Sequence, residues 1–171
     1  VTVWGMILPS VEGLLVDRKR DMIRELTNAA TSLLTAARRD EEAGLLTGDQ
    51  ARKKAMTDVA ALRYGKEGKD YFWIQDMQPR IIMHPYRPDL NGSDVADFAD
   101  SRGIHRFSEF TRLVSKRGNG FVGYVWQWKD DPARLVAKES YVSGFAPWGW
   151  IIGTGMYLDD VQEEIGRIER N

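Results

Sequence analysis

The chain has 171 residues, of which 29% are charged, and its formal net charge is -1. Because positive and negative charges nearly cancel, the composition argues against nucleic acid as a partner, which requires a strongly basic surface. The absence of cysteine excludes disulfides, thiolate nucleophiles and cysteine-based metal sites. No linker rich in Gly, Ser or Pro divides the chain, so we expect residues 1–171 to form one domain.

The first nine residues are apolar but show no helical or strand periodicity. No apolar run in the chain approaches the roughly 20 residues that cross a bilayer. Because the sequence starts at Val1 without an initiator Met, we expect a segment excised from a longer protein, with membrane helices outside it.

A long helix is expected over about residues 10–43. Its apolar side chains recur at spacings of three, four or seven residues and so share one face: Val11, Leu15, Met22, Leu26, Ala29, Leu33 and Ala37. At 1.5 Å per residue, this helix would be about 50 Å long, more than a domain of this size needs. We therefore expect part of it to serve outside the domain, for example in a homodimer.

A second helix is expected over about residues 48–63. Gly44 ends the first helix, and Thr47 with Gln50 forms the capping-box pattern that starts the second. Gly65 closes it. Its buried edge is expected to hold four apolar residues: Ala51, Ala55, Val59 and Leu62.

The segment Tyr71–Pro85 predicts a β-hairpin, because two apolar and aromatic arms flank a polar turn with a proline. In the simplest register Tyr71 lies opposite His84 and Trp73 opposite Ile82, so these four share one face. The opposite face is then purely apolar: Phe72, Ile74, Ile81 and Met83. We expect a core on the apolar side and a polar-lined cavity on the other.

The segment after this hairpin is long and rich in turn formers, as functional lids are, and a short helix follows over residues 104–116. Three further strand-like segments bring the expected sheet to five antiparallel strands: residues 121–128, 135–142 and 148–157. If the first two fold about Asp131, Tyr124 lies opposite Lys138 and Trp126 near Val136. A last helix over about residues 158–170 would leave the domain, with a seam of apolar residues: Leu158, Val161, Ile165 and Ile168.

Two interpretations of Lys138 are open at this stage. A lone lysine in a strand is commonly an exposed edge residue. The alternative is a buried ammonium group with an anionic partner. Glu139 alternates to the opposite face, and no other acidic residue is expected near Lys138, so the counter-charge would come from a ligand. A carboxylate fits, because an ammonium–carboxylate hydrogen bond is charge-assisted and strengthens away from water.

His84 and His105 are the only histidines in the chain. A single histidine is commonly a structural hydrogen-bonding residue, and these two lie on different elements, so we expect no metal site and no cofactor. The aromatic residues expected near Lys138 fit either an ordinary core or a small pocket with a few donors: Tyr71, Trp73, Tyr124, Trp126 and Tyr141. No phosphate-binding glycine loop, G-x-S-x-G or H-E-x-x-H motif is present, so we expect no enzyme.

Several short motifs occur together and in a fixed order. They are Leu62–Gly65, Tyr71–Ile74, Met83–Pro85, Leu90–Gly92, Gly120–Val122 with Tyr124 and Trp126, Lys138–Tyr141 and Pro147–Tyr157. With these motifs the chain resembles the single Cache sensor domains, in particular the second single-Cache class of bacterial methyl-accepting chemotaxis proteins and sensor histidine kinases. The resemblance covers residues 10–165.

This resemblance implies an α+β fold with a PAS-like antiparallel sheet. It also implies a periplasmic domain held at the inner membrane by flanking transmembrane helices. The ligand would be a small organic acid of the acetate, propionate, pyruvate or lactate class. Lys138 would anchor the carboxylate, with the other pocket residues as donors or walls: Tyr71, Trp73, His84, Tyr124, Trp126 and Tyr141.

Several alternatives remain open at this stage. The parent protein is a chemoreceptor or a histidine kinase. A haem or metal sensor using His84 is a second reading, and a structural or dimerisation domain without a ligand, which the long first helix suggests, is a third.

Overall fold

The computed structural model describes the backbone of residues 3–171 and the side chains of residues 12–171. The described part forms four α-helices, five strands and two 3₁₀ turns in this order: α1 (Val3–Glu42), α2 (Gly48–Ala60), β1 (Trp73–Asp76), β2 (Ile81–Met83), η1 (Pro88–Leu90), α3 (Arg106–Arg117), β3 (Asn119–Trp128), β4 (Asp131–Phe145), η2 (Ala146–Trp148), β5 (Trp150–Tyr157) and α4 (Leu158–Glu169). This confirms the predicted α+β fold.

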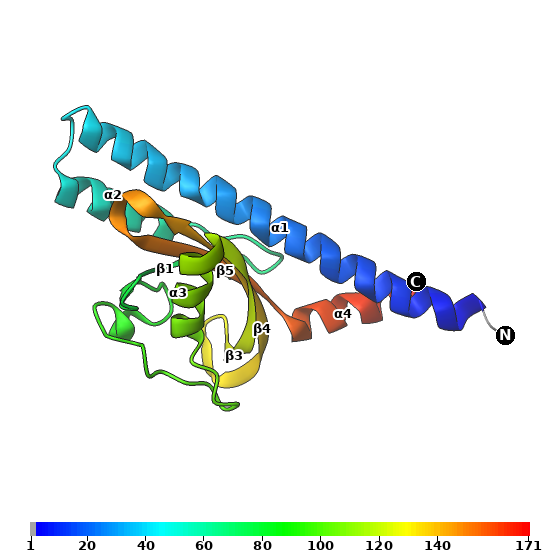
Figure 1. The fold of residues 1–171 in the computed structure, drawn as a ribbon. Helices are drawn as coiled ribbons and strands as arrows, with labels where there is room; N and C mark the ends of the chain where they lie inside the picture. The colour runs from blue at the N-terminus through cyan, green and yellow to red at the C-terminus, as the bar shows by residue number, and fades with distance from the viewer. Residues whose placement is uncertain (1–2) are drawn as a thin grey trace.

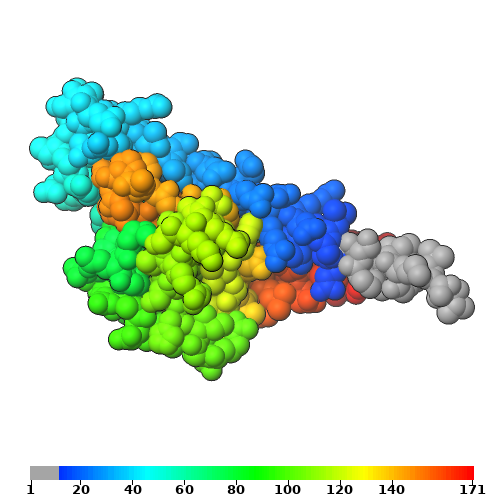
Figure 2. Space-filling view, viewed as in Figure 1, coloured from blue at the N-terminus to red at the C-terminus, as the bar shows by residue number. Residues whose placement is uncertain are grey.

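The strands form one antiparallel sheet in the order β2-β1-β5-β4-β3. Figure 1 shows α1 running along one side of the sheet and beyond it, with α3 on the other side. At the C-terminal end of the chain, α4 lies alongside the N-terminal half of α1 (Figure 2). There the Nζ atom of Lys19 lies 2.7 Å from a carboxylate oxygen of Glu164.

The buried face of α1 differs from the predicted one. The helix begins at Val3 instead of residue 10, and Val11 lies outside the described side chains. Met22 is 40% exposed and Ala29 is exposed, so the predicted stripe is wrong there. Ala37 of the predicted stripe is buried, and Leu26 and Leu33 pack against the core. The other buried residues follow a neighbouring row: Ile23, Thr27, Ala30 and Leu34. Two adjacent rows of this helix carry small and apolar side chains, and packing against α2 and the sheet selects between them.

The capping box that starts α2 is confirmed. The backbone N–H of Gln50 donates to Thr47 Oγ1 at 3.2 Å, and the backbone N–H of Thr47 donates to Gln50 Oε1 at 2.9 Å. The helix ends at Ala60, earlier than predicted, so Leu62 lies beyond it but still packs against the same core.

The predicted register of the first hairpin is wrong. Ile74 pairs with Met83 instead of Ile81, and the register then shifts at Gln75, which pairs with Ile81. The residue left over by this bulge is Ile82. As a result Ile81 packs on the side predicted for Ile82, and Ile82 packs on the side predicted for Ile81. The predicted pairings of Tyr71 with His84 and of Trp73 with Ile82 are not formed, since Tyr71 lies before β1 and the pairing of β1 with β2 begins at Ile74.

The predicted register of the second hairpin is confirmed. Tyr124 pairs with Lys138 and Trp126 with Val136, because the two strands fold back close to Asp131. Both strands extend beyond the predicted segments.

The sheet separates two hydrophobic cores. One lies between the sheet and helices α1 and α2, and it contains Phe72, Ile74 and Ile152. The other lies under α3, and it contains Trp73 and Tyr124. In the described part of the chain, none of the helices is at once long enough and apolar enough to span a membrane.

Candidate functional site

Six of the seven predicted site residues converge in the core under α3. They surround a cavity of about 10 Å³, together with Arg106 and Phe107 from the start of α3. We call these eight side chains the cage: Tyr71, Trp73, His84, Arg106, Phe107, Tyr124, Trp126 and Lys138. A cavity of this size has room for about one water molecule. The sheet, the segment after β2 and α3 therefore meet at a nearly closed polar site.

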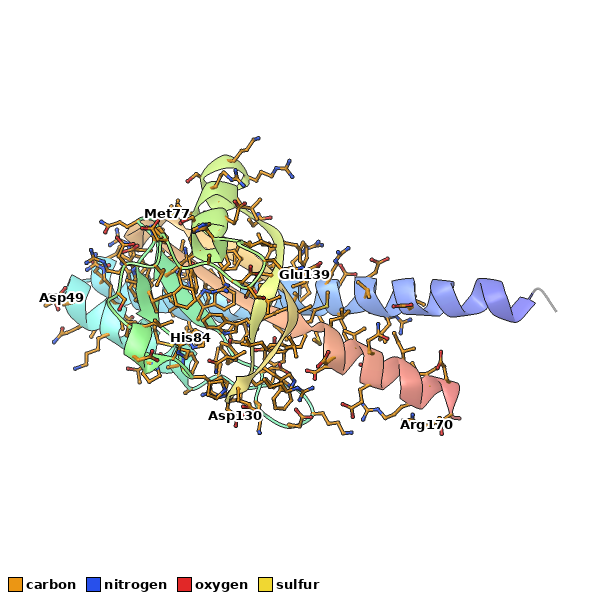
Figure 3. All side chains as sticks on the ribbon, turned by 90° about the horizontal axis from the view of Figure 1, so that it is seen from below. Asp49, Met77, His84, Asp130, Glu139 and Arg170 are labelled. Atoms are coloured by element: carbon orange, nitrogen blue, oxygen red, sulfur yellow. The ribbon has the colours of Figure 1, made fainter. Side chains whose placement is uncertain are left out.

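Tyr141 is the predicted site residue that the structure places elsewhere. Alternation along β4 puts it with Glu139 on the side of the sheet that faces α1, opposite to Lys138. Glu139 lies beside α1 (Figure 3), where its Oε2 accepts a 2.9 Å hydrogen bond from Arg20. The ring of Tyr141 lies 5.9 Å from the guanidinium carbon of Arg24. The expectation that Tyr141 shares a face with Lys138 is wrong, because the two are an odd number of residues apart.

Lys138 is 3% exposed, so the reading of an exposed edge residue is excluded. Its Nζ donates to the hydroxyl of Tyr71 at 3.0 Å and lies 4.6 to 5.2 Å from the ring centres of three aromatic residues: Tyr71, Trp73 and Tyr157. No described carboxylate lies within 4.0 Å of this nitrogen. Burial lowers the pKa of Lys138 to about 7, and the negative charge of Asp70 offsets only part of this effect.

Two glycines of β5 make room for the cage. A Cβ atom on Gly155 would come within 2.6 Å of Lys138 Cε, and one on Gly153 would come within 2.7 Å of the Trp73 ring. Real Cβ atoms do not approach other atoms so closely. The small residues of this strand therefore fix where the lysine and the indole can lie.

Arg106 belongs to the cage but was not predicted from the sequence. It is 3% exposed, and its guanidinium carbon lies 4.5 Å from the ring centre of Trp126. Its Nη2 donates to the backbone oxygen of Val125 at 3.1 Å, whereas its Nε and Nη1 have no partner. Burial lowers the pKa of Arg106, yet a guanidinium remains charged at any physiological pH. An arginine in the first turn of a helix is normally exposed, so the sequence offered no signal for this one.

His84 is a neutral hydrogen-bond donor in this site. Its Nδ1 accepts hydrogen bonds from the backbone N–H groups of Tyr86 at 3.1 Å and Arg87 at 3.0 Å. The proton of the neutral ring is therefore on Nε2. Burial, aided by the charges of Lys138 and Arg87, lowers the pKa of His84 well below its usual value.

The cage has more hydrogen-bond donors than acceptors. Four buried N–H-bearing nitrogens in it have no partner among the described residues: Nε and Nη1 of Arg106, Nε1 of Trp73 and Nε1 of Trp126. Each such group costs free energy until an acceptor reaches it. Among residues 12–171, no three side chains of His, Asp or Glu converge in a way that would hold a metal ion. Unpaired donors and two cationic side chains are the groups that a small anion could pair with.

Comparison with known proteins finds a family and several similar proteins. The family model described as Single Cache domain 2 matches residues 15–171. The methyl-accepting chemotaxis protein McpP of Pseudomonas putida is 39% identical over 95% of this chain and 29% of its own length. The sensor histidine kinase MctS of Rhizobium johnstonii is 32% identical over 86% of this chain and 30% of its own length. The chain thus spans less than a third of either relative.

Two solved structures are similar along most of the chain. One, described as a periplasmic sensor domain of a chemotaxis protein, superposes with a TM-score of 0.78 at 38% identity and covers 84% of this chain and 97% of its own. The other, described as the structural basis for carboxylic acid recognition by a Cache chemosensory domain, superposes with a TM-score of 0.80 at 38% identity. It covers 84% of this chain and 96% of its own.

Proposed function

The chain belongs to the single Cache domain 2 family of sensor domains, and from this premise we propose that it is the periplasmic ligand-binding domain of a membrane-anchored chemoreceptor. We propose further that its ligand is a small monocarboxylate. The similar domain that is described as recognising carboxylic acids supports the class of ligand.

The observation that carries this proposal is the buried ammonium group of Lys138, which has no carboxylate of residues 12–171 within 4.0 Å. An unpaired buried charge is costly, and a ligand carboxylate would remove that cost through a charge-assisted hydrogen bond. Arg106 offers two further unpaired donors at the same cavity. Lys138 is therefore the proposed anchor of the carboxylate, and Arg106 is a second cationic contact.

The neutral residues of the cage complete the proposed site. Tyr71, Tyr124 and His84 supply donors that suit the remaining lone pairs of a carboxylate or of a hydroxyl or keto group beside it. Trp73 and Trp126 are the walls. Because the cavity measures about 10 Å³, binding of any acid requires these walls to move outward, which favours short acids such as acetate, propionate, pyruvate or lactate.

The proposed signal leaves the cage through Tyr157. This residue ends β5 directly before α4, and its ring centre lies 4.9 Å from Lys138 Nζ. Its hydroxyl accepts a 3.0 Å hydrogen bond from the backbone N–H of Lys129, whose side chain contacts Asp160 of α4. A ligand that binds better to one of two arrangements of this junction would shift α4 relative to α1.

The proposal is tested by thermal unfolding and isothermal titration calorimetry with monocarboxylates of two to four carbons. A ligand at about 100 times its dissociation constant should stabilise the domain by roughly 2.7 kcal/mol, which is a clear melting shift. The variant Lys138→Ala should fold and lose the shift. If none of these acids shifts the wild-type melting temperature, the proposal fails.

The parent protein is alternatively a sensor histidine kinase, since MctS is 32% identical over 86% of this chain. Swapping the domain into a chemoreceptor and into a kinase, with the acid response as the readout, separates the two. A ligand-free dimerisation domain is a further candidate, supported by the exposed apolar Leu14 and Met22 of α1. In that case analytical ultracentrifugation would show a dimer while the calorimetric titrations stay flat.

A further inference from the structure

A second, larger cavity lies directly outside the cage. It has a volume of about 200 Å³, and its rim includes exposed residues such as Ser101, Pro132 and Leu135. We call it the outer cavity. Arg106 and Trp126 line both the cage and the outer cavity. These two side chains are therefore the wall between the two spaces.

The indole of Trp126 packs against aromatic groups of both cavities. Its ring centre lies 5.8 Å from that of His84, which lines the cage. It also lies 6.0 Å from the ring centre of Phe98, which lines the outer cavity. The other part of this wall, Arg106, is held in place by a hydrogen bond from its Nη2 to the backbone oxygen of Val125.

The outer cavity suits an aliphatic chain better than a second charged group. Of its two cationic residues, Arg106 belongs to the wall shared with the cage, and Arg87 is already paired in two hydrogen bonds with Asp89, at 3.0 and 2.9 Å. Its acidic residue Asp100 accepts three backbone hydrogen bonds, from Arg102, Ile104 and Val125, at 2.8 to 2.9 Å. The lining groups that remain for contact are mostly apolar: Phe98, Val125, Pro132 and Leu135.

We propose that the cage and the outer cavity are two parts of one binding site, and that the ring of Trp126 sets the maximum chain length of the bound monocarboxylate. With the indole in place, the carboxylate end fills the cage and the ring blocks a longer chain from reaching the outer cavity. Without the indole, the chain extends into the outer cavity. This inference rests on the proposed function, because it takes a monocarboxylate as the ligand.

The test is calorimetric titration of the whole domain with straight-chain acids from acetate to hexanoate. In the wild type, affinity should fall beyond the shortest acids. In Trp126→Ala, affinity relative to propionate should instead rise about fourfold for each added methylene group, the ratio expected for burying one such group. Trp126→Leu serves as a second variant that keeps an apolar side chain in the core, and it should shift the preferred length by a smaller amount.

Phe98→Ala is the matched control. It removes an aromatic ring that lines the outer cavity but leaves the indole wall, so the preference for short acids should persist. The inference is overturned if the affinity of Trp126→Ala and Trp126→Leu depends on the chain length of the acid as it does in the wild type. It is also overturned if Phe98→Ala allows longer acids to bind as well as Trp126→Ala does. If the wild type binds no acid of any length, the proposed function itself fails, and this inference fails with it.

Discussion

Two lysines of this chain are equally buried but have opposite surroundings. Lys129 and Lys138 are each 3% exposed. The Nζ of Lys129 lies 2.9 Å from Glu67, 3.0 Å from Asp160 and 3.7 Å from Asp70. The Nζ of Lys138 has a tyrosine hydroxyl and three aromatic rings around it.

The pKa values of the two groups move in opposite directions. Burial disfavours the charge of Lys129, but the hydrogen bond to Glu67 and the charges of Asp70 and Asp160 outweigh burial and raise its pKa. Burial dominates at Lys138 and lowers its pKa to about 7. From this difference we infer that Lys129 stabilises the fold through carboxylates of this chain. Lys138 has no such anionic partner, and a ligand carboxylate could supply one.

The largest expected effect is that of Lys138→Met. Carboxylate affinity should fall by more than about 100-fold, because a charged hydrogen bond and its Coulomb attraction are both lost. The variant should also be more stable than the wild type by a few kcal/mol at pH 6, since each unit of depressed pKa costs about 1.4 kcal/mol.

The sign of this stability difference follows from proton binding. Below pH 7 Lys138 is protonated in both the folded and the unfolded chain. The folded state is then destabilised by the full free energy of burying the charged ammonium group. Between pH 7 and about 10 only the unfolded chain keeps it, so the wild type becomes more stable as pH rises and approaches the variant. Urea unfolding at pH 6 and pH 9 measures this; a destabilised variant at pH 6 contradicts the account.

The next effect is that of Arg106→Met, which should weaken carboxylate binding by about 30-fold, the loss expected for one charge-assisted hydrogen-bonded contact. Arg112→Met is the control, because Arg112 lies on the same helix with 73% of its side chain exposed. Its affinity should stay within twofold of the wild type. Equal losses in both calorimetric titrations would show that Arg106 acts only through the net charge.

The same substitution at the other lysine should have the opposite effect on stability. Lys129→Met leaves three carboxylates without their cation and should lower the free energy of unfolding by about 2 kcal/mol, less than for a fully buried pair because Glu67 is partly exposed. Urea unfolding at pH 7 measures it. If Lys129→Met and Lys138→Met were both more stable than the wild type, the distinction between a lysine paired within the chain and an unpaired lysine would be wrong.

The smallest effect is expected for His84→Gln. Loss of one neutral donor should weaken binding about fivefold, as for a single uncharged hydrogen bond. Since His84 is already neutral, wild-type affinity should not change between pH 5.5 and 6.5. A clear step in affinity over that range, absent in the variant, would mean that His84 titrates during binding.

Much of this fold follows from sequence periodicity, because burial repeats every two residues in a strand and about every 3.6 in a helix. The pairing of Tyr124 with Lys138 could also be predicted, since a hairpin that turns close to Asp131 fixes its register by counting. The bulge between Ile74 and Gln75 could not, because the extra residue changes backbone pairing without any mark in composition.

The candidate site was partly predictable from strand patterns and motifs. Six of its residues lie on segments whose strand character and motifs are visible in the sequence. Arg106 lies at the start of α3, where Asp100 of the preceding segment accepts a hydrogen bond from the backbone N–H of Val125 and Arg106 donates to the backbone oxygen of the same residue. Such a contact between distant segments leaves no local signal.

The central claim, that Lys138 meets the ligand carboxylate, is tested most directly by proton uptake on binding. Because the pKa of Lys138 is about 7 in the empty cage, the lysine is mostly neutral at pH 8.5 and must regain its proton to hold an anion. Titration calorimetry with acetate or propionate at pH 8.5, in buffers of different ionisation enthalpy, should give an uptake close to one proton per acid, and affinity should fall up to about tenfold per pH unit above pH 7. Binding of the acid with no proton uptake and no pH dependence would contradict the claim.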